Sequence, residues 1–405
     1  MTRGRLPILA LVPVLLLGLA GGWFAALQFT SPCPLGTATC TEFATFWRAW
    51  EIASDNFVDP NAVDPAKMTD GAISGMLDSL GDQGHTAYLS PTAAASEQEQ
   101  MQGSFEGIGA YIDVREGQPL IIEPIEGSPA ERAGIMAGDL IMAVNGESVR
   151  DVTIDELRGR VRGPKGTEVT LTIRRAGVTP DPEITVTRDA VRLLSVSWRM
   201  LPGQVAHVRI NRFANDTSAE LISALGEIEN QDARTIVLDV RNNPGGLVSQ
   251  LVRVASQFLP AETTILIEVD RAGERTPYPA EADGIARDIP LVVLINGNSA
   301  SAAEILAAAL RDAGRAPVVG ERTFGTATVL RPFTFDDGAQ MRLGIAQWLT
   351  PKGEEVRGIG VEPTEPVAMP PDGEVLSPTR AATLTDTEIG ERDPQLARAL
   401  ELARQ

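Results

Sequence analysis

Cysteine and histidine are almost absent from this sequence of 405 residues, which contains only Cys33, Cys40, His85 and His207. A structural zinc site needs four such ligands close together. Two isolated cysteines and two distant histidines do not supply them, so we expect no metal site and no cofactor. In an oxidising compartment, Cys33 and Cys40 are close enough in sequence to close a short disulfide loop.

Positive charge is also scarce. Asp and Glu number 54 against 35 Lys and Arg, which gives a formal net charge of −19, and the only lysines are Lys67, Lys165 and Lys352. A nucleic-acid-binding protein presents a basic face, so this balance argues against that class. The shortage of lysine also leaves few amines to act as a general base.

Charge is missing altogether from residues 6–29, and Arg3 and Arg5 precede this run. A helix of that length crosses about 30 Å of hydrocarbon, and the flanking arginines place the rest of the chain outside the cytoplasm. We therefore expect residues 1–30 to be a single-pass membrane anchor, with a periplasmic or extracellular remainder. A cleaved signal peptide is the alternative, although the run is long for one and no clean Ala-x-Ala site follows it.

The rest of the chain alternates between helical and strand patterns, which predicts an α+β multidomain protein. Residues 31–104 read as a linker and a small helical subdomain, with helical periodicity over 41–80 broken at 56–65 and a polar linker or exposed helix at 93–104. Residues 105–190 read as a compact module with helices near 128–133 and 153–161. Its expected strands are 108–114, 120–124, 140–144, 169–173 and 184–187.

Residues 191–366 alternate strand and helix, which predicts βαβ units with right-handed crossovers. The expected strands are 205–210, 235–240 and 291–295, and the expected helices are 218–228, 247–258 and 300–312. Three later strands near 316–319, 328–335 and 340–350 are expected to join the same sheet. Residues 367–405 are rich in Pro, Thr, Asp and Glu and are expected to be loop, with a short helix at 394–403.

Three motifs in the 105–190 module occur in the order typical of one domain type: FEGIGA at 105–110, SPAERAGI at 128–135 and GDLIMAVNG at 138–146. In this order they resemble a PDZ domain of the bacterial protease type. The resemblance implies that a peptide adds to the free edge of the strand after Gly107. The amides of Gly107, Ile108, Gly109 and Ala110 would then receive its terminal carboxylate; a PDZ-shaped spacer that binds nothing is the alternative.

Further motifs extend the resemblance over residues 43–365. They are ISGMLDSLGDQGHTAYL at 73–89, LDVRNNPGG at 238–246, NSASAAE at 298–304, VGERTFG at 319–325 and the segment 350–363. Together they resemble the C-terminal processing peptidases, also called tail-specific serine proteases. This family implies a mixed α/β peptidase core of the ClpP/crotonase-like type and serine-type peptidase activity.

The resemblance makes Ser301 the nucleophile, at a strand-to-helix junction where the helix dipole favours developing negative charge. The turn containing Gly245 and Gly246 would form an oxyanion hole with the amide of Ala302. Ser301 and Glu304 also match a helix capping box, which is a purely structural explanation of the same residues. The two roles are compatible.

The chain departs from the family at its general base. The family usually has a lysine directly after Thr-Phe-Gly and a glutamine four residues later, whereas this sequence has Thr326 and Leu330. A threonine hydroxyl is too weak a base to accept the serine proton near neutral pH. His85 is the candidate substitute, since imidazole titrates near working pH; its alternative role is to pin the helical subdomain. Lys352 is a weaker candidate.

Asp312 matches a family position near the active site, but it is equally well explained as a helix-terminal aspartate. Asp239 and Arg241 are expected to brace the end of the central strand. The leading hypothesis is a membrane-anchored serine endopeptidase that binds protein C-terminal tails by its PDZ domain and cleaves with Ser301. One alternative is an inactive pseudopeptidase that acts as a peptide-binding adaptor, and another is a weak hydrolase that relies on the oxyanion hole and positioning alone. The sequence leaves a homo-oligomer open.

Overall fold

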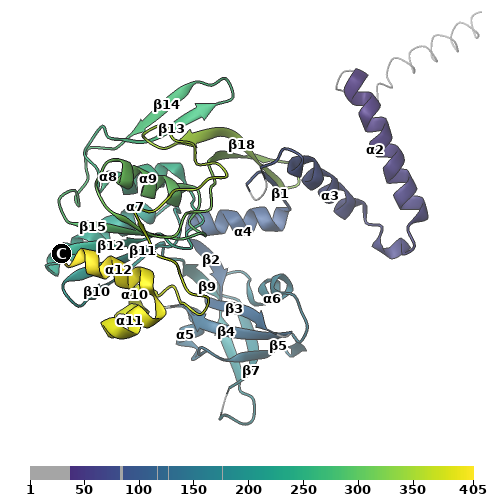
Figure 1. Cartoon of the computed structure of the whole chain (residues 1–405). Coiled ribbons are helices and arrows are strands. Elements are labelled where there is room, and N and C mark those ends of the chain that lie inside the picture. Colours follow the sequence, from purple (N-terminus) through teal and green to yellow (C-terminus); the bar gives the residue numbers. More distant parts are fainter. Residues whose placement is uncertain (1–36, 83–84, 116, 126, 176) are drawn as a thin grey trace, which may run out of the picture. The chain divides into compact units, whose positions relative to one another are not determined.

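The structure is a computed structural model that describes residues 37–405, except for 83–84, 116, 126 and 176 (Figure 1). The predicted anchor over 6–29 and Cys33 lie outside these residues. Within the described part of the chain, no helix is both long and apolar enough to span a bilayer. The chain divides into two units, Met1–Ile73 and Ser74–Gln405, which are described separately.

The first unit contains helix α2 (Thr37–Asn56), the short helix η2 (Pro60–Ala62) and the beginning of α3 (Pro65–Asp78). The predicted break between two helices is confirmed, because Pro60 and Pro65 both begin new helical segments. Along α2, four aromatic rings contact one another at centroid distances of 5.1–6.1 Å: Phe43, Phe46, Trp47 and Trp50.

The module expected over residues 105–190 to resemble a PDZ domain lies within the second unit. Its main sheet has the order β3-β4-β5-β7-β8, and β6 pairs with β5. The strands are β3 (Ala110–Arg115), β4 (Gln118–Pro124), β5 (Leu140–Val144), β6 (Glu147–Ser148), β7 (Glu168–Arg174) and β8 (Glu183–Thr187). Helices α5 (Pro129–Arg132) and α6 (Ile154–Val161) begin at the N-caps Ser128 and Thr153. The five predicted strands and both helices are confirmed to within a few residues.

A second pair of strands brackets this module. Strand β2 (Ser104–Gly107) pairs antiparallel with β9 (Asp189–Arg192), so the module's entry and exit run side by side. The preceding segment forms β1 (Ala87–Leu89) and α4 (Pro91–Gln102). The predicted linker or exposed helix is therefore a helix, which Ser90 caps and which ends at Gly103 with φ of 70°.

The core expected over residues 191–366 is built on a six-stranded sheet of order β10-β11-β12-β15-β16-β19. Strands β11 to β19 are parallel in this sheet, and β10 is antiparallel at its edge. The strands are β10 (Val196–Leu201), β11 (Val205–Ile210), β12 (Thr235–Asp239), β15 (Leu291–Ile295), β16 (Val318–Gly320) and β19 (Glu365–Pro366). The predicted βαβ arrangement is thus confirmed.

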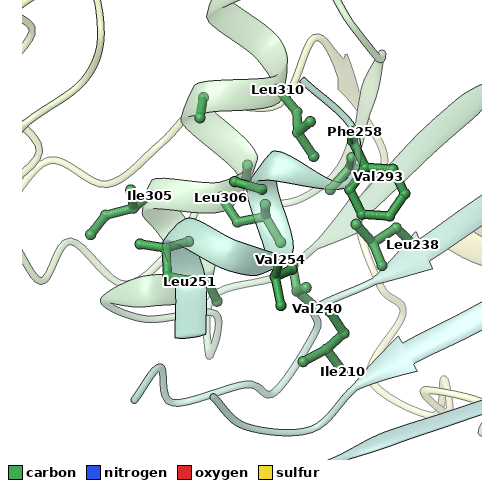
Figure 2. Close-up of a cluster of buried hydrophobic side chains, with 14 of the residues drawn as sticks. Ile210, Leu238, Val240, Leu251, Val254, Phe258, Val293, Ile305, Leu306 and Leu310 are labelled. Atoms are coloured by element: carbon green, nitrogen blue, oxygen red, sulfur yellow. The ribbon is translucent and has the colours of Figure 1, made fainter. Parts of the chain in front are cut away.

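Three helices pack on this sheet: α7 (Thr217–Asn230), α8 (Val248–Ser256) and α9 (Ala302–Asp312). Figure 2 shows part of this apolar core, to which α8 contributes Leu251 and Val254, α9 contributes Ile305, Leu306 and Leu310, and β12 contributes Leu238. Helix α9 is buried along almost its whole length. Apart from Glu304, its residues from 302 to 310 are alanines together with Ile305, Leu306 and Leu310, and a helix that is apolar on all sides is expected to be buried. This central position fixes the residue at its N-terminus, Ser301.

The two later strands do not join the parallel sheet, and that prediction is wrong. Strands β17 (Thr328–Thr334) and β18 (Gln340–Leu349) form an antiparallel hairpin, and β18 continues a separate sheet of order β1-β18-β13-β14. The partners β13 (Thr264–Asp270) and β14 (Arg275–Pro279) were not predicted. Because the tight turn near Gly338 returns the chain antiparallel, no crossover helix is available to place β18 parallel to β17.

The tail is more ordered than its composition suggests. Helix α12 (Pro394–Ala403) matches the predicted helix, but α10 (Pro378–Ala381) and α11 (Asp386–Arg392) replace the expected loop. Ser377 and Thr385 cap these two helices through their side chains. Leu396, Ala399 and Leu400 are buried against the sheet residues Val237 and Leu294, so the tail is part of the core.

Candidate active site

Ser301 lies where the chain passes from β15 into α9. Its backbone has φ 53° and ψ −116°, a conformation that costs a non-glycine residue of order 1–3 kcal/mol and is held by its surroundings. Its side chain is half-buried, whereas Ala302 and the residues that follow it are buried. The partial positive charge of a helix N-terminus stabilises negative charge that develops beside this residue.

The glycine turn predicted to face Ser301 does lie against it. A Cβ atom added to Gly245 would stand 2.7 Å from Ser301 Cβ and 3.0 Å from Ala302 N. On Gly246, an added Cβ would stand 2.2 Å from the carbonyl oxygen of Phe213. Their φ angles are +96° and +142°, so both positions require glycine because of close approach and backbone conformation together.

The N–H groups around this turn are not equivalent. The N–H of Gly245 donates to Asn243 Oδ1 at 2.8 Å. Among the described residues, no acceptor receives the N–H of Gly246 or that of Ala302. The geometry therefore favours Gly246 and Ala302 over Gly245 as donors to an oxyanion.

Glu304, in the first turn of α9, organises the surroundings of Ser301. Its side chain is fully buried, and its carboxylate accepts five hydrogen bonds. The donors are the N–H groups of Ser301 (2.7 Å), Gly325 (2.7 Å) and Thr326 (2.8 Å) and the hydroxyls of Thr323 and Thr326 (2.6 Å to the latter). A buried carboxylate needs such donors to replace its lost hydration. They tie the 323–326 segment to the start of α9.

Thr326 completes this network instead of supplying a base. Its side chain is 2% exposed; the hydroxyl donates to Glu304 and also accepts from the N–H of Ser301. A threonine hydroxyl is too weak a base to take the serine proton near neutral pH, and this one is already committed to Glu304 and the Ser301 N–H. Leu330 lies in β17 opposite Gly344, and its alkyl side chain offers no hydrogen bond.

His85 lies beside the same segment. Its ring packs edge-on against Phe324 with centroids 6.1 Å apart, and its Nδ1 is 3.7 Å from Asp82 Oδ1. Burial lowers the pKa of His85 below its usual value, although Asp82 opposes the change, so the imidazole is neutral near pH 7. The hydrogen bonds of the described residues include none between His85 and Ser301.

Asp82 holds the His85 turn in place. It accepts from the hydroxyls of Thr86 at 2.7 Å and Thr328 at 3.0 Å, and Arg357 lies 3.4 Å away. These bonds join the turn that carries His85 to β17, the strand that begins just after Thr326. The structure thus brings His85 to the edge of the Ser301 surroundings without placing it in contact with the nucleophile.

Asp239 and Arg241 have the bracing role that the sequence predicts. Both are fully buried at the end of β12, where Arg241 bonds Asp239 at 2.7 and 2.9 Å and Asp393 at 2.7 Å. Burial alone would raise the pKa of Asp239, but Arg241 and His207 hold it well below the usual range. The network joins the tail helices to the strand that leads into the glycine turn.

Asp312 is at the opposite end of α9 from Ser301. Asp312 is eleven positions after Ser301, which corresponds to about 16 Å along the helix axis. Asp312 is nearly fully buried and pairs with Arg311 at 2.8 Å, and Lys352 lies 3.9 Å from it at the surface. The structure therefore does not bring either Asp312 or Lys352 to the nucleophile, and it favours the helix-terminal explanation.

The predicted peptide site of the PDZ module also has a defined geometry. Strand β3 is at one end of the sheet order, which leaves its outer edge available for β-augmentation. Ahead of it, Gly109 has φ +77°, and an added Cβ would lie 2.4 Å from Ser128 Cβ. The carbonyl of Ile108 accepts from Ala130 N–H at 2.7 Å. Gly107, Ile108, Gly109 and Ala110 thus form the turn that leads into this edge.

Glu304 is the main residue whose role the sequence did not reveal. Its position three residues after Ser301 indicated a capping box, but nothing indicated that Thr323, Gly325 and Thr326 would also converge on it. Its location between Ala303 and Ile305 on a largely apolar helix was the available signal, because a buried carboxylate needs several donors. Among the described residues, no cluster of His, Cys, Asp or Glu is placed to hold a metal ion.

Ser301 is strained, lies at a helix N-terminus and faces a glycine turn. This arrangement is typical of serine-peptidase-type α/β cores. In this chain a PDZ-like module is inserted before the core. Residues 204–367 match peptidase family S41, and residues 120–175 match the PDZ domain. The chain belongs to the C-terminal processing proteases of peptidase family S41.

Curated relatives support this membership. The chain is 37% identical over 331 residues to the carboxy-terminal processing protease CtpA of Bacillus subtilis (strain 168), covering 82% of this chain and 70% of the relative. It is 36% identical over 308 residues to a probable CtpA-like serine protease of Staphylococcus aureus (strain COL), covering 76% of this chain and 61% of the relative.

Among solved structures, the chain resembles a putative S41 protease from Bacteroides fragilis NCTC 9343. The TM-score is 0.51 at 18% sequence identity, and the match covers 77% of this chain and 85% of that one. At this identity the likeness shows the fold alone.

Proposed function

We propose that this chain is a serine-type endopeptidase that binds protein C-terminal tails through its PDZ domain and cleaves peptide bonds with Ser301. The observation that carries the proposal is the position of Ser301 against Gly245 and beside Ala302, with the N–H groups of Ala302 and of the neighbouring Gly246 unbonded among the described residues. Ser301 Oγ attacks the scissile carbonyl carbon and loses its proton to a base, and the carbonyl oxygen takes up negative charge beside the two amides. The amine leaves with a proton, and water then hydrolyses the serine ester.

For the base we propose His85. Two observations support it: its pKa is lowered by burial, so it is neutral and able to accept a proton at pH 7, and it packs on Phe324, two residues before Thr326. Transfer to it requires a bridging water or a closer approach in the substrate complex, because hydrogen bonds of catalytic groups often tighten only there.

The second candidate function is a catalytically inactive adaptor that captures protein tails. It is favoured by one specific observation: the hydroxyl of Thr326 is bound to Glu304 and to Ser301 N–H at the position where the family has its lysine. In that case the site would bind a peptide without turning it over.

One experiment separates the two functions. The full chain in detergent, either wild type or Ser301→Ala, is incubated with a reduced, unfolded protein, and new peptide termini are counted by mass spectrometry. Cleavage by the wild type that is lost in Ser301→Ala is the expected result. An inert wild type that still binds a C-terminal peptide would refute the endopeptidase and leave the adaptor.

We further propose that residues 6–29 anchor the chain in the membrane as a single pass, with the PDZ and peptidase parts on the periplasmic or extracellular side. The support is the charge-free run and the preceding Arg3 and Arg5. Protease added to intact cells or spheroplasts should digest the PDZ and peptidase parts. Recovery of the chain in the soluble fraction after gentle lysis would refute the anchor.

A further inference from the structure

The turn that carries His85 also holds a carboxylate that the proposed reaction does not use. Asp82 lies three residues before His85, and its side chain is 9% exposed, against 18% for the imidazole. Asp82 Oδ1 is 3.7 Å from His85 Nδ1. A carboxylate this close to one ring nitrogen influences which of the two nitrogens carries the proton.

The side chain of Asp82 is not needed to close this turn. The backbone carbonyl oxygen of Asp82 already accepts the N–H groups of His85 and Thr86, each at 3.2 Å. The carboxylate has partners of its own: the hydroxyl of Thr86 donates to Oδ2, the hydroxyl of Thr328 donates to Oδ1, and Arg357 lies beside it. These partners come from three segments of the chain, and together they fix the carboxylate next to the imidazole.

This placement distinguishes the two tautomers of neutral His85. In a neutral imidazole one nitrogen carries a proton and the other has a lone pair. A lone pair on Nδ1 would face an oxygen of Asp82, which is negatively charged and has no proton to donate. A proton on Nδ1 would instead present positive charge to that oxygen, which is favourable at this distance. The lone pair of His85 is then on Nε2.

A short segment of the chain connects this turn to the nucleophile. The hydroxyl of Thr326 accepts from the N–H of Ser301, and the hydroxyl of Thr328 donates to Asp82. The Cα atoms of residues two positions apart are separated by at most about 7 Å. The same three residues therefore hold both Ser301 and the turn of Asp82 and His85, which limits how far the two can move apart.

We propose that Asp82 is a positioning residue for catalysis, which keeps the proton of neutral His85 on Nδ1 and leaves Nε2 to accept the proton of Ser301. The proposal rests on the endopeptidase function with His85 as the base. It adds a third residue to that site, so that Ser301, His85 and Asp82 act in series where the family usually has a serine and a lysine.

The proton moves between two atoms in this reaction. As Ser301 Oγ bonds to the carbonyl carbon, its proton passes to His85 Nε2 through a bridging water or after a closer approach. His85 becomes an imidazolium whose Nδ1–H lies beside the Asp82 carboxylate, and the opposite charges attract. The imidazolium then gives the Nε2 proton to the leaving amine as the C–N bond breaks. Asp82 remains ionised throughout.

The first test reads the tautomer without any catalysis. The chain has only two histidines, His85 and His207, so isotope-labelled histidine in the untagged full chain, reconstituted in lipid, gives two imidazoles in a solid-state NMR spectrum. The spectrum of His85→Gln identifies the His85 signals. The lowered pKa of His85 makes it neutral at about pH 8, and we expect its proton on Nδ1. A wild-type His85 that carries its proton on Nε2 would overturn the proposal.

The same spectrum of Asp82→Asn shows whether the carboxylate is responsible. The amide of asparagine can donate to Nδ1 as well as accept from it, so the Nδ1–H form should fall from the dominant form to a minority. An unchanged tautomer in Asp82→Asn would overturn the proposal. The wild-type spectrum keeps the proposal testable if Asp82→Asn fails to fold.

The second test is kinetic and compares wild type, Asp82→Asn and a control, Asp78→Asn. The exposed Asp78 lies four residues before Asp82 and loses the same charge. Asp82→Asn should lower kcat about 100-fold or more and change KM less than about threefold, because it alters the base and not the substrate contacts. Asp78→Asn should match the wild type in both. A kcat for Asp82→Asn equal to that of the control, or a loss confined to KM, would overturn the proposal.

The pH profile distinguishes positioning from a loss of folded protein. Four charged groups act on the imidazole: Asp82 and Glu304 raise the pKa of His85, whereas Arg342 and Arg357 lower it. Removing the charge of Asp82 should therefore move the acidic limb of kcat/KM to lower pH. A smaller amount of folded enzyme would lower the rate without moving the limb. A limb at the wild-type pH in Asp82→Asn would overturn the proposal.

The results also separate this proposal from the endopeptidase function. An Nδ1–H tautomer that depends on Asp82, in a protein that never cleaves, would refute the endopeptidase and retain the hold of Asp82 on the His85 proton. Cleavage at equal rates by the wild type and Asp82→Asn would retain the endopeptidase and refute the positioning role.

Discussion

Replacing Thr326 by valine removes one hydroxyl from the Glu304 network and preserves the shape of the side chain. The lost hydroxyl donates to a buried carboxylate at 2.6 Å, and a hydrogen bond to a charged group contributes about 1.5–3 kcal/mol to stability. The Ser301 N–H keeps its other acceptor, Glu304. We therefore expect the free energy of unfolding of the peptidase core to fall by about 2 kcal/mol, close to the middle of that range.

The assay is urea unfolding followed by tryptophan fluorescence. Trp348 is buried next to the altered segment, and its backbone N–H donates to Ala327 at 2.9 Å. With a denaturant dependence of about 3 kcal/mol per molar urea, the midpoint should fall by about 0.7 M. Thr334→Val is the matched control, because Thr334 is exposed at the end of β17, the strand that follows Thr326, and the expected change is within about 0.5 kcal/mol.

A Thr326→Val midpoint equal to that of Thr334→Val would refute the reasoning. It would mean that the hydroxyl of Thr326 does not stabilise Glu304, and that the Thr at the lysine position has no structural part in holding Ser301.

Three further outcomes follow from the contacts described. His85→Gln should reduce kcat/KM about 100-fold or more if His85 is the base, and the wild-type rate should fall on acidification as the imidazole becomes protonated; a rate that His85→Gln leaves intact would exclude it. Gly246→Ala should destabilise the core because the added Cβ would lie 2.2 Å from the carbonyl oxygen of Phe213. The control Gly226→Ala, which has open space on α7, should stabilise the protein by up to about 1 kcal/mol. Equal melting temperatures for the two variants would contradict this. Asp393→Ala should cost about 3 kcal/mol, since it removes one partner of the buried Arg241; a calorimetric change below about 1 kcal/mol would show the pair to be dispensable.

The pH dependence of stability has a defined sign at two groups, Asp239 and His85. Because the pKa of Asp239 is held below its usual value, its contribution is complete above a pH of about 4, the usual Asp value, and is lost as the pH falls further. The lowered pKa of His85 acts in the same direction near its usual value of 6.5: the unfolded chain binds the proton more readily, so stability falls as the pH drops below about 6.5. Thermal unfolding from pH 7 to 3 should therefore show decreasing melting temperatures, and a rise on acidification would contradict both assignments.

The parallel core was predictable because strands buried in a parallel sheet are predominantly apolar. Strands Val205–Ile210 and Leu291–Ile295 have the predicted bounds, and each is buried along nearly its whole length. The second sheet was not predictable in the same way. Whether β17 and β18 extend the first sheet depends on a partner, β13, whose residues 264–270 mix apolar and charged side chains.

The tail shows a local signal that composition obscured. Thr385 and Glu388 form a capping box at the start of α11, and this pattern is visible in the sequence. The abundance of Pro and acidic residues nevertheless suggested loop. The packing of the tail against the core depends on contacts between distant residues. Asp393 caps α12 and also binds Arg241, 152 residues earlier in the chain, and no local pattern predicts that second bond.

For the site, the motifs located the participating segments but not their contacts. Ser301 and the Gly245 turn were predicted to meet, and they do. The sequence did not distinguish Gly245, whose N–H is bonded to Asn243, from Gly246, because that difference depends on the φ angles and the fold of the turn. It also gave no means of seeing that Thr326 bonds to Glu304 and Ser301.

A crystal of the full chain with a peptide boronic acid bound tests the central claim most directly, since boron reports covalent attack by a serine oxygen. The account predicts a bond from boron to Ser301 Oγ, with one boronate oxygen within hydrogen-bond distance of the Gly246 and Ala302 amides. A boronate that remains trigonal and unattached to Ser301, or whose oxygens face away from both amides, would contradict it.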